Sequence, residues 1–202
     1  RGQESAGIAS TDGHRIRLHT GMGLVSQVFN EDILCNLSGD IAIGHNRYST
    51  TGSSRLANAQ PIIADSPIGP IAVAHNGNIV NAADLRQELE QQGFTFRSST
   101  DSEVIAYLIA SAPGRDCVEK IRYAMHRLKG AYSLVIMTRD SLVGVRDPLG
   151  VRPLCLGTID GGWAIASESC ALDHIGAKYV REVEPGEVTI ISSRGVESSR
   201  ET

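Results

Sequence analysis

Helical and strand-like patterns occupy separate parts of this sequence. Three helical segments follow one another between residues 81 and 130, with apolar side chains spaced three or four residues apart. On either side of that stretch the apolar residues form short runs typical of strands, separated by glycine-bearing turns such as residues 160–162. Strands grouped apart from helices are typical of α+β folds, whereas α/β folds alternate the two. The sequence therefore predicts one α+β domain.

Capping residues and turns set the bounds of the expected elements. One helix should be capped by Asn81, and the next should begin with the capping-box spacing of Thr100 and Glu103. A third helix carries one apolar face and should end at Gly130. Strands are expected over residues 7–10, 15–20, 41–45, 71–75, 132–138, 142–146, 154–158, 163–167 and 187–192.

Composition excludes several classes of protein. The chain has 202 residues, of which 41% are hydrophobic and 21% charged, an ordinary balance for a globular protein. No apolar run approaches the ~18 residues of a membrane-spanning helix, and no signal peptide is recognisable. A net charge of −4 and an aromatic content of 4% argue against nucleic-acid binding, which needs a basic surface or stacking platforms. We therefore expect a cytoplasmic protein with neither nucleic-acid nor membrane partners.

The cysteines and histidines show no metal-binding spacing. The closest cysteine pair, Cys155 and Cys170, is 15 residues apart, so no Cys-x-x-Cys motif for zinc, an iron–sulfur cluster or redox chemistry is present. We expect the four cysteines to be buried free thiols. The six histidines are scattered, and no P-loop, H-E-x-x-H or G-x-S-x-G motif occurs. The sequence thus gives no indication of metal-dependent chemistry.

Three polar patches contain the groups needed to bind a free amino acid. Arg47, at the end of an apolar strand, offers a planar guanidinium suited to a carboxylate. Asn76 and Gly77, where another strand ends, combine a side-chain amide with a backbone N–H, the composition of an oxyanion hole. Asp101, at a helix start, could receive an ammonium group. An α-amino acid with a carbonyl in its side chain fits all three patches.

Each patch also has a plain structural interpretation. Asp101 could cap its helix, Arg47 could form a surface ion pair, and residues 75–77 could be a turn. These interpretations predict three unconnected features, whereas a binding site requires the patches to converge on one cavity. Their joint occurrence at the ends of strands and helices favours the binding site.

The same patches resemble motifs of the class II, or N-terminal nucleophile, glutamine amidotransferases. The resemblance covers the whole chain, and it is closest to the branch that transfers ammonia to phosphoribosyl pyrophosphate in purine synthesis. The matching segments are residues 1–7 (RGQESAG), 45–52 (HNRYSTTG), 75–78 (HNGN), 99–103 (STDSE), 146–154 (RDPLGVRPL) and 167–173 (SESCALD).

The resemblance implies a fold and a set of site residues. The implied fold is a four-layer αββα sandwich, in which two stacked antiparallel sheets lie between helical layers. Arg47 would bind the α-carboxylate of glutamine and Asp101 its α-ammonium group, while Asn76 and Gly77 would form the oxyanion hole. Two further residues would help to line the pocket, Tyr48 and Thr50.

The nucleophile of this family is a cysteine at the mature N-terminus, whose own α-amine acts as the general base. Arg1 corresponds to a position one strand and one helix downstream, and none of the four cysteines here aligns with the nucleophile. We therefore expect residues 1–202 to be a glutaminase domain without its nucleophile segment and without the downstream phosphoribosyltransferase domain. Such a piece should be inactive by itself and should expose apolar surface. No cofactor is expected within it; Mg²⁺ is expected in the downstream domain, and some family members carry an iron–sulfur cluster.

Three functions agree with these motifs. The leading hypothesis is hydrolysis of glutamine to supply ammonia for phosphoribosylamine synthesis from phosphoribosyl pyrophosphate. A second is a non-catalytic, glutamine-binding regulatory module, and a third is the glutaminase domain of another class II amidotransferase. The leading hypothesis implies glutamine and a phosphoribosyltransferase domain of the same chain as partners, in a homo-oligomeric enzyme.

Overall fold

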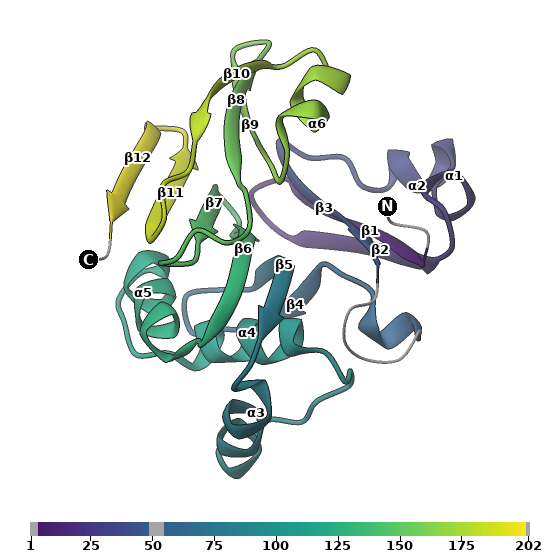
Figure 1. Ribbon diagram of the computed structural model, residues 1–202. Coiled ribbons are helices and arrows are strands. Elements are labelled where there is room, and N and C mark those ends of the chain that lie inside the picture. The colour runs from purple at the N-terminus through teal and green to yellow at the C-terminus, as the bar shows by residue number, and fades with distance from the viewer. Residues whose placement is uncertain (1–3, 49–54, 201–202) are drawn as a thin grey trace.

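The computed structural model describes residues 4–48 and 55–200. Its paired strands are all antiparallel and form two three-stranded sheets and one six-stranded sheet (Figure 1). The strands are β1 (Ser5–Thr11), β2 (Ile16–Met22), β3 (Ile41–Arg47), β4 (Ile62–Ala64), β5 (Ile71–Ile79), β6 (Gly130–Met137), β7 (Ser141–Arg146), β8 (Cys155–Ile159), β9 (Gly162–Ala166), β10 (Lys178–Glu182), β11 (Glu187–Ser192) and β12 (Gly195–Arg200). The helices are α1 (Val25–Val28), α2 (Glu31–Cys35), α3 (Ala82–Gln91), α4 (Asp101–Ser111), α5 (Cys117–Arg127) and α6 (Ser169–His174), with a 3-10 turn at Leu56–Asn58.

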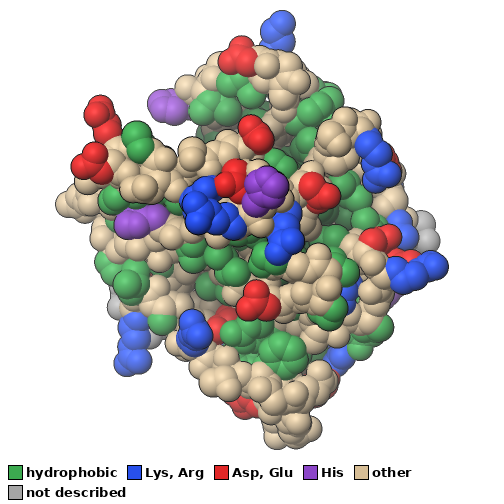
Figure 2. All heavy atoms as spheres, turned by 180° about the vertical axis from the view of Figure 1, so that it is seen from behind, with side chains coloured by type: hydrophobic (Ala, Val, Ile, Leu, Met, Phe, Trp, Pro, Cys, Tyr) green, Lys and Arg blue, Asp and Glu red, His purple; other side chains and the backbone are tan. Residues whose placement is uncertain are grey.

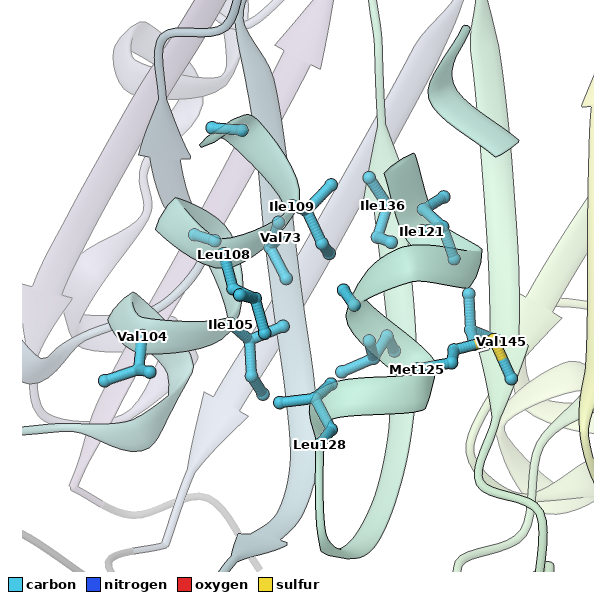
Figure 3. Packing of buried hydrophobic residues seen from close by; sticks show 14 of the residues in the cluster. Val73, Val104, Ile105, Leu108, Ile109, Ile121, Met125, Leu128, Ile136 and Val145 are labelled. Atoms are coloured by element: carbon cyan, nitrogen blue, oxygen red, sulfur yellow. The ribbon is translucent and has the colours of Figure 1, made fainter. Parts of the chain in front are cut away.

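The six-stranded sheet, in the order β12-β11-β7-β6-β5-β4, carries the main hydrophobic core on one face. Helices α4 and α5 cover this face, and α3 packs against α4. Figure 3 shows Ile105 and Ile109 of α4 beside Val73 of β5, and Ile121 of α5 beside Ile136 of β6. Since burying such a side chain contributes roughly 1.5–3 kcal/mol, this helix–sheet contact is a principal source of stability.

The other face of the six-stranded sheet packs against the two smaller sheets. Ala9 of β1 and Ile43 of β3 lie in one buried cluster with Ala72 and Met137 of the large sheet. In a second cluster Leu154, Leu156 and Val183 pack against residues that include Val135 of β6 and Ile191 of β11. Helix α1 contacts β1, and α6 contacts β9 and β10, so short helices cover the outer side. The order of layers confirms the expected αββα sandwich.

Each of the two small sheets has two strands that are paired on one side only, and β3 and β9 are among them. Within the described residues, β3 pairs only with β1, and β9 pairs only with β8. The second sheet layer is therefore divided into a β2-β1-β3 part and a β10-β8-β9 part. Unpaired strand edges expose backbone N–H and C=O groups to other chains.

Most elements agree with the sequence-based expectations, with exceptions that have a physical cause. Strands β10 and β12 were not predicted because their side chains are mostly exposed and polar, so their pairing with β8 and β11 determines them. Strand β4 and the helices α1, α2 and α6 were not predicted either, because each is too short, at three to six residues, to show a periodic pattern. The predicted capping box of α4 does not form. The carboxylate of Glu103 instead accepts hydrogen bonds from Arg97 N (3.0 Å) and Ser98 N (2.7 Å), in the loop that precedes the helix.

All four cysteines are free, but only one is buried. Cys155 lies in β8 and its thiol donates a hydrogen bond to Ala166 O. Cys117 is half-buried at the start of α5, whereas Cys35 and Cys170 are exposed. The expectation of buried thiols is thus wrong for the last two, because α2 and α6 are short surface helices of which only one side is covered.

Charged side chains of both signs are interspersed on the surface. Figure 2 shows Lys and Arg side chains beside Asp and Glu side chains on one face, in keeping with the small net charge of −4. In the part of the chain that the structure describes, no helix combines the length and the apolar character needed to cross a membrane.

Candidate active site

His75 marks the point at which three elements that carry predicted site residues meet. Its backbone oxygen accepts a hydrogen bond from Nε2 of His45 (3.0 Å), on the strand that ends in the predicted carboxylate-binding arginine. Its Nδ1 lies 3.2 Å from Oγ of Ser102 and 3.7 Å from Oδ1 of Asp101, at the start of α4. His75 itself precedes the predicted oxyanion-hole residues in β5. The fold thus brings β3, β5 and α4 to one place.

Asp101 is the first residue of α4, but its carboxylate does not cap that helix. Oδ2 accepts a hydrogen bond from the backbone N–H of Ile79 in β5 (3.0 Å). The preceding residue, Thr100, is the N-cap and makes no side-chain capping bond. The simple capping interpretation of Asp101 is therefore wrong. The carboxylate connects the helix to the strand that carries Asn76 and Gly77.

Arg47 is buried rather than on the surface. Only 5% of its area is exposed, and its Nη1 forms an ion pair with Oε1 of Glu4. Glu4 directly precedes β1, in which Ser5 lies opposite Arg47 across the sheet. Sequence analysis missed Glu4 as a partner of Arg47, although it belongs to the RGQESAG motif. The paired carboxylate fixes the orientation of a guanidinium that has five N–H donors and can bind more than one acceptor.

The two remaining predicted lining residues contribute less to this geometry. Tyr48 follows β3 directly and is 73% exposed. Thr50 lies outside the described residues.

Asn76 and Gly77 lie within β5, opposite Ser133 and Tyr132 of β6, and the strand continues to Ile79. Sequence analysis placed them at the end of a strand, because Asn and Gly usually interrupt one. Glycine is required at position 77 because a Cβ there would lie 2.0 Å from the backbone oxygen of Ala131. Both residues are half-exposed, so a ligand can approach them.

Gln60 holds the backbone of His75 from both sides. The N–H of His75 donates to Oε1 of Gln60 (2.7 Å), and Nε2 of Gln60 donates to the oxygen of His75 (3.4 Å). Gln60 is 5% exposed. Nothing in the sequence around Gln60 indicates this contact, which joins residues 15 positions apart.

Burial keeps both histidines of this site neutral at pH 7. Desolvation lowers the pKa of His75 to about 4, against the opposing effect of the Asp101 carboxylate. Desolvation also lowers the pKa of His45 to about 4. Nδ1 of His45 and Nε2 of His75 are buried and have no hydrogen-bond partner among the described residues. The histidines therefore contribute polarity but no positive charge to the site.

Comparison with known protein families identifies the family of this chain. Residues 45–174 match the family model of a glutamine amidotransferase domain. The chain belongs to this family. The match includes β5, α4 and the last three residues of β3, and hence part or all of every element that meets at His75.

Similar proteins and structures place this glutamine amidotransferase domain more closely. It is 52% identical to the amidophosphoribosyltransferase of Synechococcus elongatus over 98% of this chain and 41% of that protein. The amidophosphoribosyltransferase of Archaeoglobus fulgidus is 49% identical over 98% of this chain and 43% of that protein. The structure of glutamine phosphoribosylpyrophosphate amidotransferase from B. subtilis, complexed with ADP and GMP, matches with a TM-score of 0.91 and 44% identity, over 98% of this chain and 43% of that chain. The chain thus spans about two fifths of the length of these relatives.

Residues 146–150 (RDPLG) of this amidotransferase domain form a turn that a buried side chain stabilises by hydrogen bonds. Asp147 is fully buried, and its carboxylate accepts hydrogen bonds from the backbone N–H groups of Leu149 (2.9 Å), Val151 (3.1 Å) and Tyr132 (3.3 Å). The Gly150 N–H donates to the backbone oxygen of Asp147 (2.9 Å), which is the hydrogen bond that closes a β-turn. Because Tyr132 lies opposite Gly77, the turn supports the strand beside the predicted oxyanion hole.

A cleft of about 490 Å³ lies elsewhere, between β8, β10 and α6. None of the predicted site residues lines it; the lining residues are Pro153, Leu154, Cys155, Ser167, Glu168, Ser169, Asp173, Tyr179 and Glu182. Among the described residues, no group of three His, Cys, Asp or Glu side chains is placed to hold a metal ion.

Proposed function

We propose that this chain is the glutaminase domain of an amidophosphoribosyltransferase. The observation that carries the proposal is the meeting of β3, β5 and α4 at His75. These three elements carry a cation, a pair of neutral donors and a carboxylate. Glutamine needs these three kinds of group, for its α-carboxylate, its side-chain carbonyl and its α-ammonium. Similarity to named amidophosphoribosyltransferases over 98% of the chain supports the assignment.

Each group has a defined part in amide hydrolysis. Arg47 would bind the α-carboxylate, and Asp101 would bind the α-ammonium group. Asn76 and Gly77 would donate hydrogen bonds to the oxyanion that forms when the side-chain amide carbon of glutamine becomes tetrahedral. The nucleophile would be a cysteine thiol preceding these residues, activated by its own α-amine. Collapse of the intermediate releases ammonia, and water then hydrolyses the thioester to glutamate.

In the whole protein, ammonia would pass to a phosphoribosyltransferase domain. There it would displace pyrophosphate from phosphoribosyl pyrophosphate and form phosphoribosylamine, with Mg²⁺ bound in that domain. We further propose that the whole protein is a homo-oligomer of the cytoplasm.

Replacement of Asn76 by Ala in the full-length protein tests the proposal. Loss of one oxyanion donor should slow glutamate formation from glutamine by about 10²–10³-fold. Phosphoribosylamine synthesis from added ammonia should continue, because it does not use this site. An equal loss of both activities would contradict the assignment of Asn76. Glutamine binding without any glutamate formation by the unaltered protein would favour the regulatory-module hypothesis instead.

A further inference from the structure

The side chain of His75 occupies a junction that the proposed mechanism does not use. It is 4% exposed, and its Nδ1 faces α4 while its Nε2 faces Gly77. A Cβ at position 77 would lie 2.8 Å from this Nε2. The imidazole therefore fills the space between the predicted oxyanion-hole glycine and the first turn of α4.

The surroundings of His75 determine which ring nitrogen carries the proton. A neutral imidazole has one N–H and one acceptor nitrogen. Nδ1 has Oγ of Ser102 at 3.2 Å and the carboxylate of Asp101 at 3.7 Å, whereas Nε2 has no hydrogen-bond partner within residues 4–48 and 55–200. A proton on Nε2 would leave a buried donor unpaired, which is unfavourable. The proton therefore belongs on Nδ1, directed at the start of α4.

The first turn of α4, which carries the Asp101 carboxylate, is consequently connected to β5 at two points. Oδ2 of Asp101 accepts from the N–H of Ile79, two residues beyond Gly77 in β5. Its Oδ1 lies 3.7 Å from Nδ1 of His75, two residues before Gly77 in the same strand. The hydrogen bond of that Nδ1 is with Oγ of Ser102, the next residue of α4. Because these contacts connect the start of α4 to β5, the distance between the Asp101 carboxylate and residues 76 and 77 is fixed.

We propose that His75 is a positioning residue for glutamine binding. It holds the Asp101 carboxylate at a fixed distance from Asn76 and Gly77. That distance matches the separation between the α-ammonium group and the side-chain amide within one glutamine molecule. This inference rests on the proposed function. His75 acts through Asp101 and touches no reacting atom. Its loss should weaken glutamine binding more than it slows the chemical step.

A matched pair of variants separates positioning from packing. In His75→Asn the amide nitrogen can take the place of Nδ1 and still donate, whereas His75→Leu has a similar shape without a donor. Glutamate formation is measured in the full-length protein over a range of glutamine concentrations. We expect His75→Leu to raise KM for glutamine about tenfold or more, the effect of losing the buried hydrogen bond to Ser102 and leaving its partner in the first turn of α4 unpaired, with kcat within about threefold. His75→Asn should keep KM within about threefold of the unaltered protein. Equal KM values for the two variants would overturn the proposal, as would a loss in kcat alone.

A second comparison covers the case in which His75→Leu does not fold. His75→Gln places its amide near the position of Nε2 and not of Nδ1. We therefore expect His75→Gln to raise KM about tenfold relative to His75→Asn, with ammonia-dependent synthesis unchanged in both. Equal KM values for the Gln and Asn variants would overturn the proposal.

Asp101→Asn distinguishes failure of this inference from failure of the proposed function. If Asp101 binds the α-ammonium group, Asp101→Asn raises KM, and adding His75→Leu changes KM by less than about twofold because His75 acts through Asp101. An unchanged KM in Asp101→Asn would refute the role of Asp101 and the positioning role with it. A raised KM in Asp101→Asn, with none in His75→Leu, would overturn only the role of His75.

Discussion

The closest backbone approach beside the candidate site is at Gly77, and replacing it with Ala tests how tightly β5 and β6 are packed there. The new Cβ would lie 2.0 Å from the oxygen of Ala131 and 2.8 Å from the Cα of Tyr132. Both are backbone atoms, so no side chain can rotate away. Since ordinary contacts begin at 3.4 Å, the methyl group and the oxygen would have to move apart by about 1.4 Å.

Such a displacement exceeds what a strand pair can absorb with its hydrogen bonds intact. Overpacking costs about 1–3 kcal/mol, and one or two weakened ladder hydrogen bonds add about 0.5–1.5 kcal/mol each. We expect Gly77→Ala to lower the free energy of unfolding by about 2–4 kcal/mol, which corresponds to roughly 5–15 °C in Tm.

Gly44→Ala in β3 is the matched control. The nearest atom that a Cβ at position 44 would meet in the described part of the chain is the backbone oxygen of Gly7, at 3.6 Å. The single tryptophan, Trp163, reports unfolding of the chain by fluorescence in urea or on heating. We expect the control to change stability by less than about 0.5 kcal/mol. If Gly77→Ala were no more destabilising than Gly44→Ala, the steric argument for glycine at the site would be refuted.

Three further predictions concern the chain as a whole. Residues 1–202 alone should release no ammonia from glutamine above a buffer blank, because no cysteine in them has a free α-amine; turnover by this piece would mean that an internal residue is the nucleophile. Since the pKa values of His45 and His75 fall from 6.5 to about 4 on folding, the unfolded chain takes up protons first, and stability should decline as pH falls from about 6.5 to 4. Urea unfolding should show this decline, and His45→Gln should reduce it; an unchanged slope would contradict the burial argument. Alkylation of the folded chain, followed by mass spectrometry, should modify the exposed Cys35 and Cys170 before the other two thiols, and uniform modification would contradict the fold around them.

The sequence by itself determined the features that depend on neighbours a few residues apart. The periodicity of apolar side chains indicated α3, α4 and α5, and the turn at residues 160–162 indicated the β8–β9 hairpin. The polar patches were visible as well, because Arg, Asn-Gly and Asp at the boundaries of apolar segments are unusual enough to suggest chemistry. Local patterns of this kind need no knowledge of which segments later meet.

Only the tertiary structure decided how those patches are connected. Arg47 is paired with Glu4, His75 is held by Gln60, and Asp101 is bonded to β5 instead of its own helix. The strands β10 and β12 likewise exist because of the partners beside them. The three side-chain contacts join residues 15 to 43 positions apart in the chain. Their partners are decided by the way the sheets stack and bury polar groups that must then find hydrogen bonds. No pattern within a short stretch of sequence contains that information.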